Sequence, residues 1–160
     1  MTDHDKIEKR VGLVFQHVAR LRSRYFDQKL AEHGLTAAQV YALNYLFRED
    51  GLTQVELARY LGIGTVAVSG LIDRLEAANW VIRKPDTRDR RSNRIWLLPA
   101  AAEKKHALQD SGNAVNLASM AGLSSDEVDQ LLDMMHKIRK NLLEALKDDP
   151  EIVLPPRDKK

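Results

Sequence analysis

Apolar residues recur every three or four positions over most of this chain, which is the spacing of an amphipathic helix. The first helix is predicted from Lys6 to His33, where the apolar positions step by 4, 3, 4, 3 and 4 residues, as in a coiled coil. Gly34 is expected to end it, and Thr36 with Gln39 forms a capping box that opens a second helix through Arg48. The apolar stripe of the first helix comprises Ile7, Val11, Val14, Val18, Leu21 and Tyr25.

A helix-turn-helix is predicted in the segment that follows. Thr53 and Glu56 form a second capping box, and apolar residues then follow on one side of a short helix. Gly62 is placed to end this helix in the left-handed conformation that glycine adopts at low cost. Another helix is expected from Thr65 to Ala77. Two helices joined by a turn of three or four residues that contains glycine are the signature of this motif.

The next segment is predicted to be a β-hairpin with a long charged tip. Residues 80–84 and 94–98 are rich in β-forming side chains, and turn-forming residues 85–93 join them. From Arg83 to Arg94 there are six basic and two acidic residues, a net charge of +4 in a chain whose total is +2. On its own such a segment is most simply a solvated surface loop. Beside a helix-turn-helix, this concentrated positive charge favours contact with DNA.

Two further helices are predicted after the hairpin. The first is expected from Ala100 to Met120. Ser124 and Glu127 form a third capping box, which opens a last helix through Lys147. The tail 148–160 contains proline and mixed charges, buries little, and is expected to be flexible. The apolar stripe of the last helix comprises Val128, Leu131, Leu132, Met135, Ile138, Leu142 and Leu146.

Together these elements predict a mainly α fold with a small β-hairpin wing, in a single domain of 160 residues. Residues 34–99 would form a winged helix-turn-helix lobe, and residues 6–33 with 100–147 a helical dimerisation lobe. Cysteine is absent, which excludes disulfides and thiolate metal sites. No apolar run is long enough to cross a bilayer, and the first residues lack the pattern of a secretory signal. We therefore expect a cytoplasmic protein without membrane contact.

The two terminal helices carry apolar stripes that the winged helix-turn-helix lobe has no obvious surface to cover. A monomer would leave these stripes exposed, so we expect a homodimer built from them. A dimer would also let two helix-turn-helix units read the two half-sites of a pseudo-palindromic operator in double-stranded DNA. The alternative is that the two stripes pack against each other within one chain.

Several segments resemble the MarR family of winged-helix transcription regulators. The best matches are Leu57–Ile63, Leu71–Glu76, Arg88–Arg91 and Arg94–Leu97, within a resemblance that covers residues 6–146. The resemblance implies a dimer formed by the terminal helices. It also implies repression of nearby promoters, relieved by small ligands that are often aromatic or phenolic.

The resemblance further implies roles for single residues. Asp89 would hold the wing while Arg91 enters the DNA minor groove. Asn79 replaces a glycine of the family, which is tolerable because asparagine also accepts the left-handed conformation. Gly64 and Gly70 depart from the family pattern and leave a recognition helix with little charge, whose methyl groups favour an A·T-rich operator. The predicted DNA contacts are Thr65, Val66, Ala67, Ser69, Gly70 and Arg74 in the helix, and Arg88, Asp89, Arg90, Arg91 and Arg94 in the wing.

Little in the sequence indicates catalysis or a bound metal. The five histidines are not spaced as ligands within one element, and no nucleophile motif or phosphate-binding loop occurs, so we expect no enzyme activity, metal or cofactor. A metal site assembled from several elements stays open as an alternative. An effector pocket, suited to a carboxylated aromatic, is expected where the two lobes meet. Its candidate residues, which could equally be core or dimer contacts, are His17, Arg20, Arg24, Tyr25, Trp80 and Trp96.

These observations lead to one main hypothesis and two alternatives. The main hypothesis is a dimeric, sequence-specific DNA-binding transcription regulator that acts as a repressor and is relieved by a small, aromatic ligand. The first alternative is an architectural DNA-binding protein that uses the wing arginines without reading sequence, since the recognition helix carries so little charge. The second is a helical protein-interaction module whose basic wing is incidental.

Overall fold

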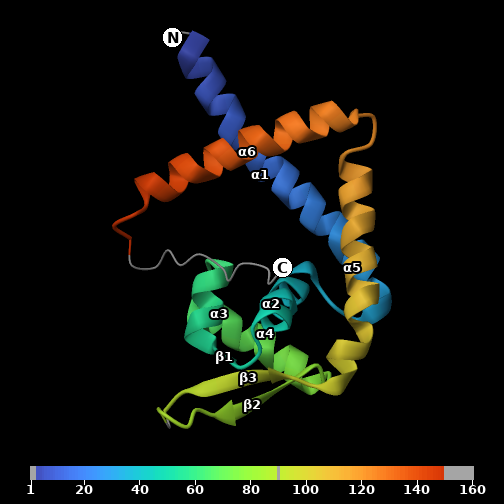
Figure 1. Cartoon of the computed structure of the whole chain (residues 1–160), viewed down its shortest axis with the longest axis vertical. Helices are drawn as coiled ribbons and strands as arrows, with labels where there is room; N and C mark the ends of the chain where they lie inside the picture. The colour runs from blue at the N-terminus through green and yellow to red at the C-terminus, as the bar shows by residue number, and fades with distance from the viewer. Residues whose placement is uncertain (1–2, 90, 150–160) are drawn as a thin grey trace.

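The computed structural model describes residues 3–89 and 91–149. Figure 1 shows a lobe of short helices and a small sheet at one end, and longer helices that extend away from it. In chain order the elements are α1 (Asp3–Leu30), the 3-10 helix η1 (Ala31–His33), α2 (Ala37–Arg48), β1 (Leu52–Thr53), α3 (Gln54–Leu61), α4 (Thr65–Ala77), β2 (Val81–Pro85), β3 (Asn93–Leu97), α5 (Pro99–Ser119) and α6 (Ser125–Ala145). The fold is mainly helical, as predicted.

Local capping chemistry sets the helix boundaries that the sequence predicts. Capping boxes form at Thr36, Thr53 and Ser124: each hydroxyl accepts a hydrogen bond from the backbone N–H three residues on, and the side chain there accepts one from the cap's own N–H. Gly34 and Gly62 follow helices in the left-handed conformation, both with φ +66°. These groups satisfy backbone donors and acceptors that a helix end leaves unpaired.

Two helices end more than one residue earlier than predicted. α1 ends at Leu30 instead of His33, because the last residues before Gly34 tighten into a 3-10 turn. α6 ends at Ala145 instead of Lys147. Most of the tail that was expected to be flexible, residues 150–160, lies outside the described residues.

The sheet has three antiparallel strands in the order β1-β3-β2, whereas the sequence predicted only the hairpin of β2 and β3. The additional strand pairs Leu52 with Ile95. Just before it, Gly51 has φ +79°, and a Cβ at this position would lie 2.6 Å from the ring of Trp96. Glycine therefore lets the chain approach β3 closely enough to pair. A strand of two residues has no periodicity to recognise, which is why the sequence pattern missed it.

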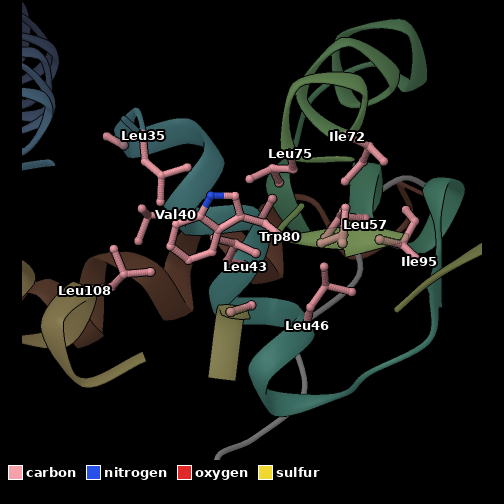
Figure 2. Close-up of a cluster of buried hydrophobic side chains, with 14 of the residues drawn as sticks. Leu35, Val40, Leu43, Leu46, Leu57, Ile72, Leu75, Trp80, Ile95 and Leu108 are labelled. Atoms are coloured by element: carbon pink, nitrogen blue, oxygen red, sulfur yellow. The ribbon is translucent and has the colours of Figure 1, made fainter. Parts of the chain in front are cut away.

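The core lies where α2, α3 and α4 pack against the sheet. Figure 2 shows Trp80, from the start of the hairpin, in the middle of a cluster of buried aliphatic side chains. Leu43, Leu57 and Leu75 of three different helices are fully buried in it. Burial of one such side chain is worth about 1.5–3 kcal/mol, so these contacts fix α4 relative to the wing. Leu108 of α5 also joins the cluster and ties the long helices to this lobe.

The long helices are packed unevenly. α1 and α5 contact each other, and Arg22 of α1 donates to Asn116 Oδ1 at 2.7 Å and to Ser119 Oγ at 2.6 Å in α5. α6 buries none of its side chains. On the predicted stripes, Val14 remains 60% exposed and Leu142 58% exposed. The intra-chain alternative requires the two stripes to cover each other. Within the described part of a single chain they do not.

No single helix in the described part of the chain is long and apolar enough to cross a membrane. The pair α3 and α4 meets the length and composition criteria only when the two are taken together, and it bends by 109° at the break between them. Both helices also contribute side chains to the buried core, in keeping with the bend of a helix-turn-helix.

Candidate nucleic-acid interface

In the helix-turn-helix, α4 packs against the rest of the lobe with one face and leaves the other face outside. The bend of 109° between α3 and α4 lies within the roughly 90–120° range of this motif. Ala58 is buried near the corner, and its carbonyl accepts hydrogen bonds from the N–H groups of Gly62 and Ile63. The residues that α4 buries are Val68, Leu71, Ile72 and Leu75. Because these four occupy one side of the helix, the opposite side faces solvent.

The solvent side of α4 carries most of the helix residues predicted to contact DNA. Val66 is 86% exposed, so its methyl groups gain nothing from the folding of this chain and are free to contact a partner. Gly64, before the first turn, supplies no side-chain cap, so no cap side chain occupies the first N–H groups of the helix. The predicted contacts divide into the exposed residues Thr65, Val66, Ala67 and Arg74 and the half-buried residues Ser69 and Gly70.

Asp86 organises the base of the wing. Its side chain is buried, its Oδ1 accepts from the backbone N–H of Arg88 at 2.8 Å, and its Oδ2 lies 2.7 Å from Nε of Arg94. The N–H of Arg88, with the guanidinium of Arg94, lowers the pKa of Asp86 below its ordinary value of 3.8. Asp86 is therefore ionised at neutral pH and holds both sides of the loop. Its role was not predicted, although an aspartate two residues before a loop N–H is a known turn signal.

Asp89 shapes the tip of the wing. Its Oδ1 accepts from the backbone N–H of Arg91 at 3.0 Å and lies 3.3 Å from Nε of the same residue. Its carbonyl accepts from the N–H of Ser92. The side chain of Arg91 is 92% exposed, so the turn presents a guanidinium to solvent at a fixed point. Arg90, also predicted to contact DNA, lies outside the described residues.

Among the described basic residues of the hairpin, Arg83 and Arg94 are half-buried and paired with carboxylates. Arg94, a predicted DNA contact, is paired with Asp86. Arg83 contacts Asp73 and Glu76 of α4, each at 2.7 Å. The net charge of +4 therefore overstates the charge that the hairpin offers to a partner. The exposed basic residues described in the hairpin are Lys84, Arg88 and Arg91.

The six residues predicted to bind an effector do not come together. Trp80 is buried in the core, and Trp96 lies over Gly51 at the sheet. Tyr25 is half-buried beneath Lys29, whose Nζ is 5.3 Å from the ring centre. The other three, all exposed on α1, are His17, Arg20 and Arg24. The periodicity of α1 could not show which of its faces meets α2 and α5.

A cleft of about 260 Å³ lies instead between α1, α2 and α5. Its walls include the rings of Phe26 and Tyr41, whose centres are 5.9 Å apart. Arg22 supplies a guanidinium whose two recorded partners, a serine hydroxyl and an asparagine amide oxygen, are uncharged. The amide side chains in the lining are Asn44, Gln109, Asn113 and Asn116. The cleft thus combines aromatic walls with one unneutralised positive charge.

The described residues contain no group of three or more histidine, cysteine, aspartate or glutamate side chains placed to hold a metal ion. The metal site left open by the sequence, assembled from several elements, would need such a group. His33 instead lies 3.8 Å from the carboxylate of its neighbour Glu32.

Related sequences are those of helix-turn-helix transcriptional regulators. A sequence profile of the MarR family matches residues 33–92. The uncharacterized HTH-type transcriptional regulator YcgE of Bacillus subtilis strain 168 is 33% identical over 102 residues, which are 63% of this chain and 64% of that protein. The aligned segment thus spans just under two thirds of YcgE. The HTH-type transcriptional regulator TtmR of Methylorubrum extorquens strain PA1 is 28% identical over 140 residues, which are 88% of this chain and 71% of TtmR.

Solved structures show the same architecture. The apo form of MarR from E. coli superposes with a TM-score of 0.72 at 26% identity, over 79% of this chain and 95% of that one. Reduced AbfR, in a structure bound to DNA, superposes with a TM-score of 0.77 at 20% identity, over 91% of this chain and 98% of that one. These regulators share the six helices and the small sheet, and theirs is not a family of enzymes. Residues 33–92 of this chain match the MarR family, and the fold as a whole is that of the family's winged-helix transcriptional regulators.

Proposed function

We propose that this chain is a dimeric, sequence-specific DNA-binding transcription regulator, and that it represses its target promoters until a small aromatic ligand binds. The observation that carries the proposal is an exposed face of α4 beside a wing whose tip holds Arg91 in solvent. In this arrangement α4 enters the major groove and Arg91 the adjacent minor groove. AbfR, which has the same fold, has been solved bound to DNA, and this supports DNA binding by the present chain.

The dimer in this proposal follows from the exposed apolar stripes of the terminal helices. A soluble protein rarely leaves a contiguous apolar surface in water, and a two-fold interface would bury these stripes against their copies. Two copies of α4 would then face half-sites centred about 10 bp apart. The exposed side chains on the stripes are Val11, Val14, Val18 and Leu21 in α1, Leu132, Met135, Ile138 and Leu142 in α6, and Leu146 directly after α6.

Within each half-site, α4 reads bases mainly through methyl groups. Val66 and Ala67 can contact the C5-methyl group of thymine, and the hydroxyl of Thr65 can bond a base or a phosphate. Arg74 is the one basic residue of α4 and lies near its far end. A recognition helix of this kind favours A·T pairs at the positions it contacts.

The effector binds, in this proposal, in the cleft between α1, α2 and α5. An aromatic carboxylate matches both features of that cleft, because its ring can pack on Phe26 and Tyr41 while its charge pairs with Arg22. α1 and α5 belong to the long-helix part, whereas α2 belongs to the lobe that carries α4. A ligand that binds between the long helices and the lobe, and that favours one angle between these two parts, would therefore change the separation of the two α4 helices in the dimer.

Selection of bound fragments from random DNA, followed by competition of the selected fragment against bulk DNA, tests the DNA-binding part. A specific regulator should bind the selected fragment ~10³-fold more tightly than bulk DNA, or better. An architectural protein would bind both alike. A protein-interaction module would retard neither fragment, even at low salt.

Titration of aromatic carboxylates into the protein–DNA complex tests the effector part. We expect release of the selected DNA from the wild-type protein, and a much weaker response from Arg22→Gln. Release that does not depend on Arg22 would place the ligand elsewhere. A complex that no aromatic carboxylate dissociates would contradict this class of effector.

A further inference from the structure

Arg83 of β2 joins the wing to both helices of the helix-turn-helix. Its Nη1 lies 2.7 Å from Glu76 Oε2, and its Nη2 lies 2.7 Å from Asp73 Oδ1. Nη2 also donates to the carbonyl of Ser69 at 3.2 Å, and Nε donates to Gln54 Oε1 at 3.0 Å. The backbone N–H of Arg83 donates to Glu76 Oε1 at 2.9 Å. We call these five residues the Arg83 clamp.

The geometry of the clamp requires a guanidinium. The side chain of Arg83 is only 18% exposed, and its three nitrogens each hold at least one partner at a fixed direction. A planar fork can bridge two carboxylates, an amide and a carbonyl at once, whereas the ammonium of lysine is a single point with rotating donors. The partners lie in α4 and at the start of α3, so the contacts restrain β2 against both helices.

The clamp also offsets negative charge on the helix that faces DNA. Asp73 and Glu76 are the two acidic residues of α4, and both contact Arg83. The backbone N–H and the guanidinium of Arg83 lower the pKa of Glu76 below its ordinary value of 4.5, which shows how directly they hold the ionised carboxylate. Without Arg83 the two carboxylates would face DNA phosphates unpaired and repel them.

We infer that Arg83 is a positioning residue for sequence reading: it fixes the angle between the wing and α4 and offsets the acidic side of that helix, without itself contacting DNA. The inference rests on the proposed DNA-binding function. The base contacts of α4 and the minor-groove contact of the wing must be made at the same time, so a fixed angle lets a correct base sequence satisfy both. Loss of the clamp therefore lowers the preference for the operator more than it lowers binding to bulk DNA.

The first arm of the test measures the angle without DNA. The chain has no cysteine, so spin labels can be attached at Ala77→Cys on α4 and Thr87→Cys on the wing without a background. Labelled chain is diluted with unlabelled chain so that a dimer carries one labelled copy. We expect a narrow distribution of label distances with Arg83 present, and a broader one in the Arg83→Gln and Arg83→Lys backgrounds. An unchanged distribution in both would overturn the clamp.

The second arm measures affinity for a selected operator fragment and for bulk DNA over a range of salt concentrations. Arg83→Gln should reduce the ratio of the two affinities about tenfold or more, the size of one misread base pair, and leave the slope of log K against log salt unchanged. Lys84→Gln is the matched control, because it removes the same charge from the next residue of β2, which is exposed and outside the clamp. It should leave the ratio unchanged.

The affinity measurements distinguish Arg83 as a positioning residue from Arg83 as a phosphate contact. If Arg83 were a phosphate contact, Arg83→Gln would weaken operator and bulk DNA equally and reduce the salt slope, and the inference would be wrong. If Arg83→Gln does not fold, Arg83→Lys and Glu76→Gln disrupt the same contacts and must lower the ratio in its place. If the wild-type protein binds no DNA, the proposed function fails, whereas the label distances still decide whether Arg83 fixes the wing.

Discussion

The winged lobe and the terminal helices carry the same kind of amphipathic pattern but bury it to opposite extents. Leu43 of α2 is fully buried, whereas Leu142 of α6 is 58% exposed, although each lies on the apolar side of its helix. In the lobe, three helices and a sheet enclose one another's apolar sides. Among the described residues, no helix or strand encloses the apolar side of α6 in this way. The difference supports the proposed homodimer: the lobe covers its apolar sides within one chain, whereas the described residues leave those of the terminal helices exposed.

The largest expected effect comes from placing a charge on the exposed stripes. Val14→Glu or Leu142→Glu should give a monomer or an insoluble chain, because a carboxylate cannot be buried unpaired in an apolar interface. The loss of the second binding site should weaken operator binding by ~10²–10⁴-fold. Sedimentation velocity and DNA titration measure the two effects. As a control, Val55→Glu on the exposed side of α3 should remain dimeric, and stripe variants that stayed dimeric would show that the interface lies elsewhere.

The next effect compares two leucines that are truncated in the same way. Leu46→Ala removes a side chain that is 1% exposed, and should lower the free energy of unfolding by about 2–5 kcal/mol. Leu117→Ala removes one that is 75% exposed, and should change it by about 0.5 kcal/mol or less. Urea unfolding at one protein concentration measures both. A large loss at Leu117 would reveal a contact that a single chain does not contain.

Within the lobe, substitution of the exposed Arg91 should have a different effect from substitution of Arg94, which is paired with Asp86. Arg91→Ala should weaken binding to operator and to bulk DNA together, and flatten the slope of log K against log salt by roughly two per dimer. Arg94→Ala should instead lower stability, because it leaves the buried carboxylate of Asp86 without its ion partner. Salt titrations and thermal unfolding of the two variants separate these effects. Equal salt slopes would mean that both arginines contact phosphates.

The smallest expected effect, with the clearest sign, is that of Asp89→Ala. The substitution makes the wing more positive but removes the acceptor that holds Arg91, so binding should become a few-fold weaker. Counting charges predicts the opposite. Tighter binding of the operator by this variant would show that the wing acts as a basic loop without a defined shape.

How much the sequence predicts depends on how far apart the interacting residues lie. The capping boxes, the helix-ending glycines and the left-handed Asn79 were predicted correctly, because their signals lie within a few residues of each other. The strand β1 was not, since it forms only by pairing with β3. The engagement of Arg83 with α3 and α4 likewise depends on residues up to 29 positions away.

The effector cleft shows the same limit. Its walls come from three helices, and the pattern of α1 alone placed candidate residues on the exposed side of that helix. Arg22 was not singled out, because its neighbours Asn116 and Ser119 follow it by more than ninety residues. Only the packing of α5 on α1 brings these groups to one site.

We propose that two chains, joined through the terminal helices, place two winged lobes on one DNA duplex. Sedimentation equilibrium of the full chain mixed with a selected DNA fragment tests it most directly, because it weighs the protein and the complex in the same solution. We expect a free dimer and a complex of two chains per duplex. A free monomer, or a saturated complex with a single chain on the duplex, would contradict it.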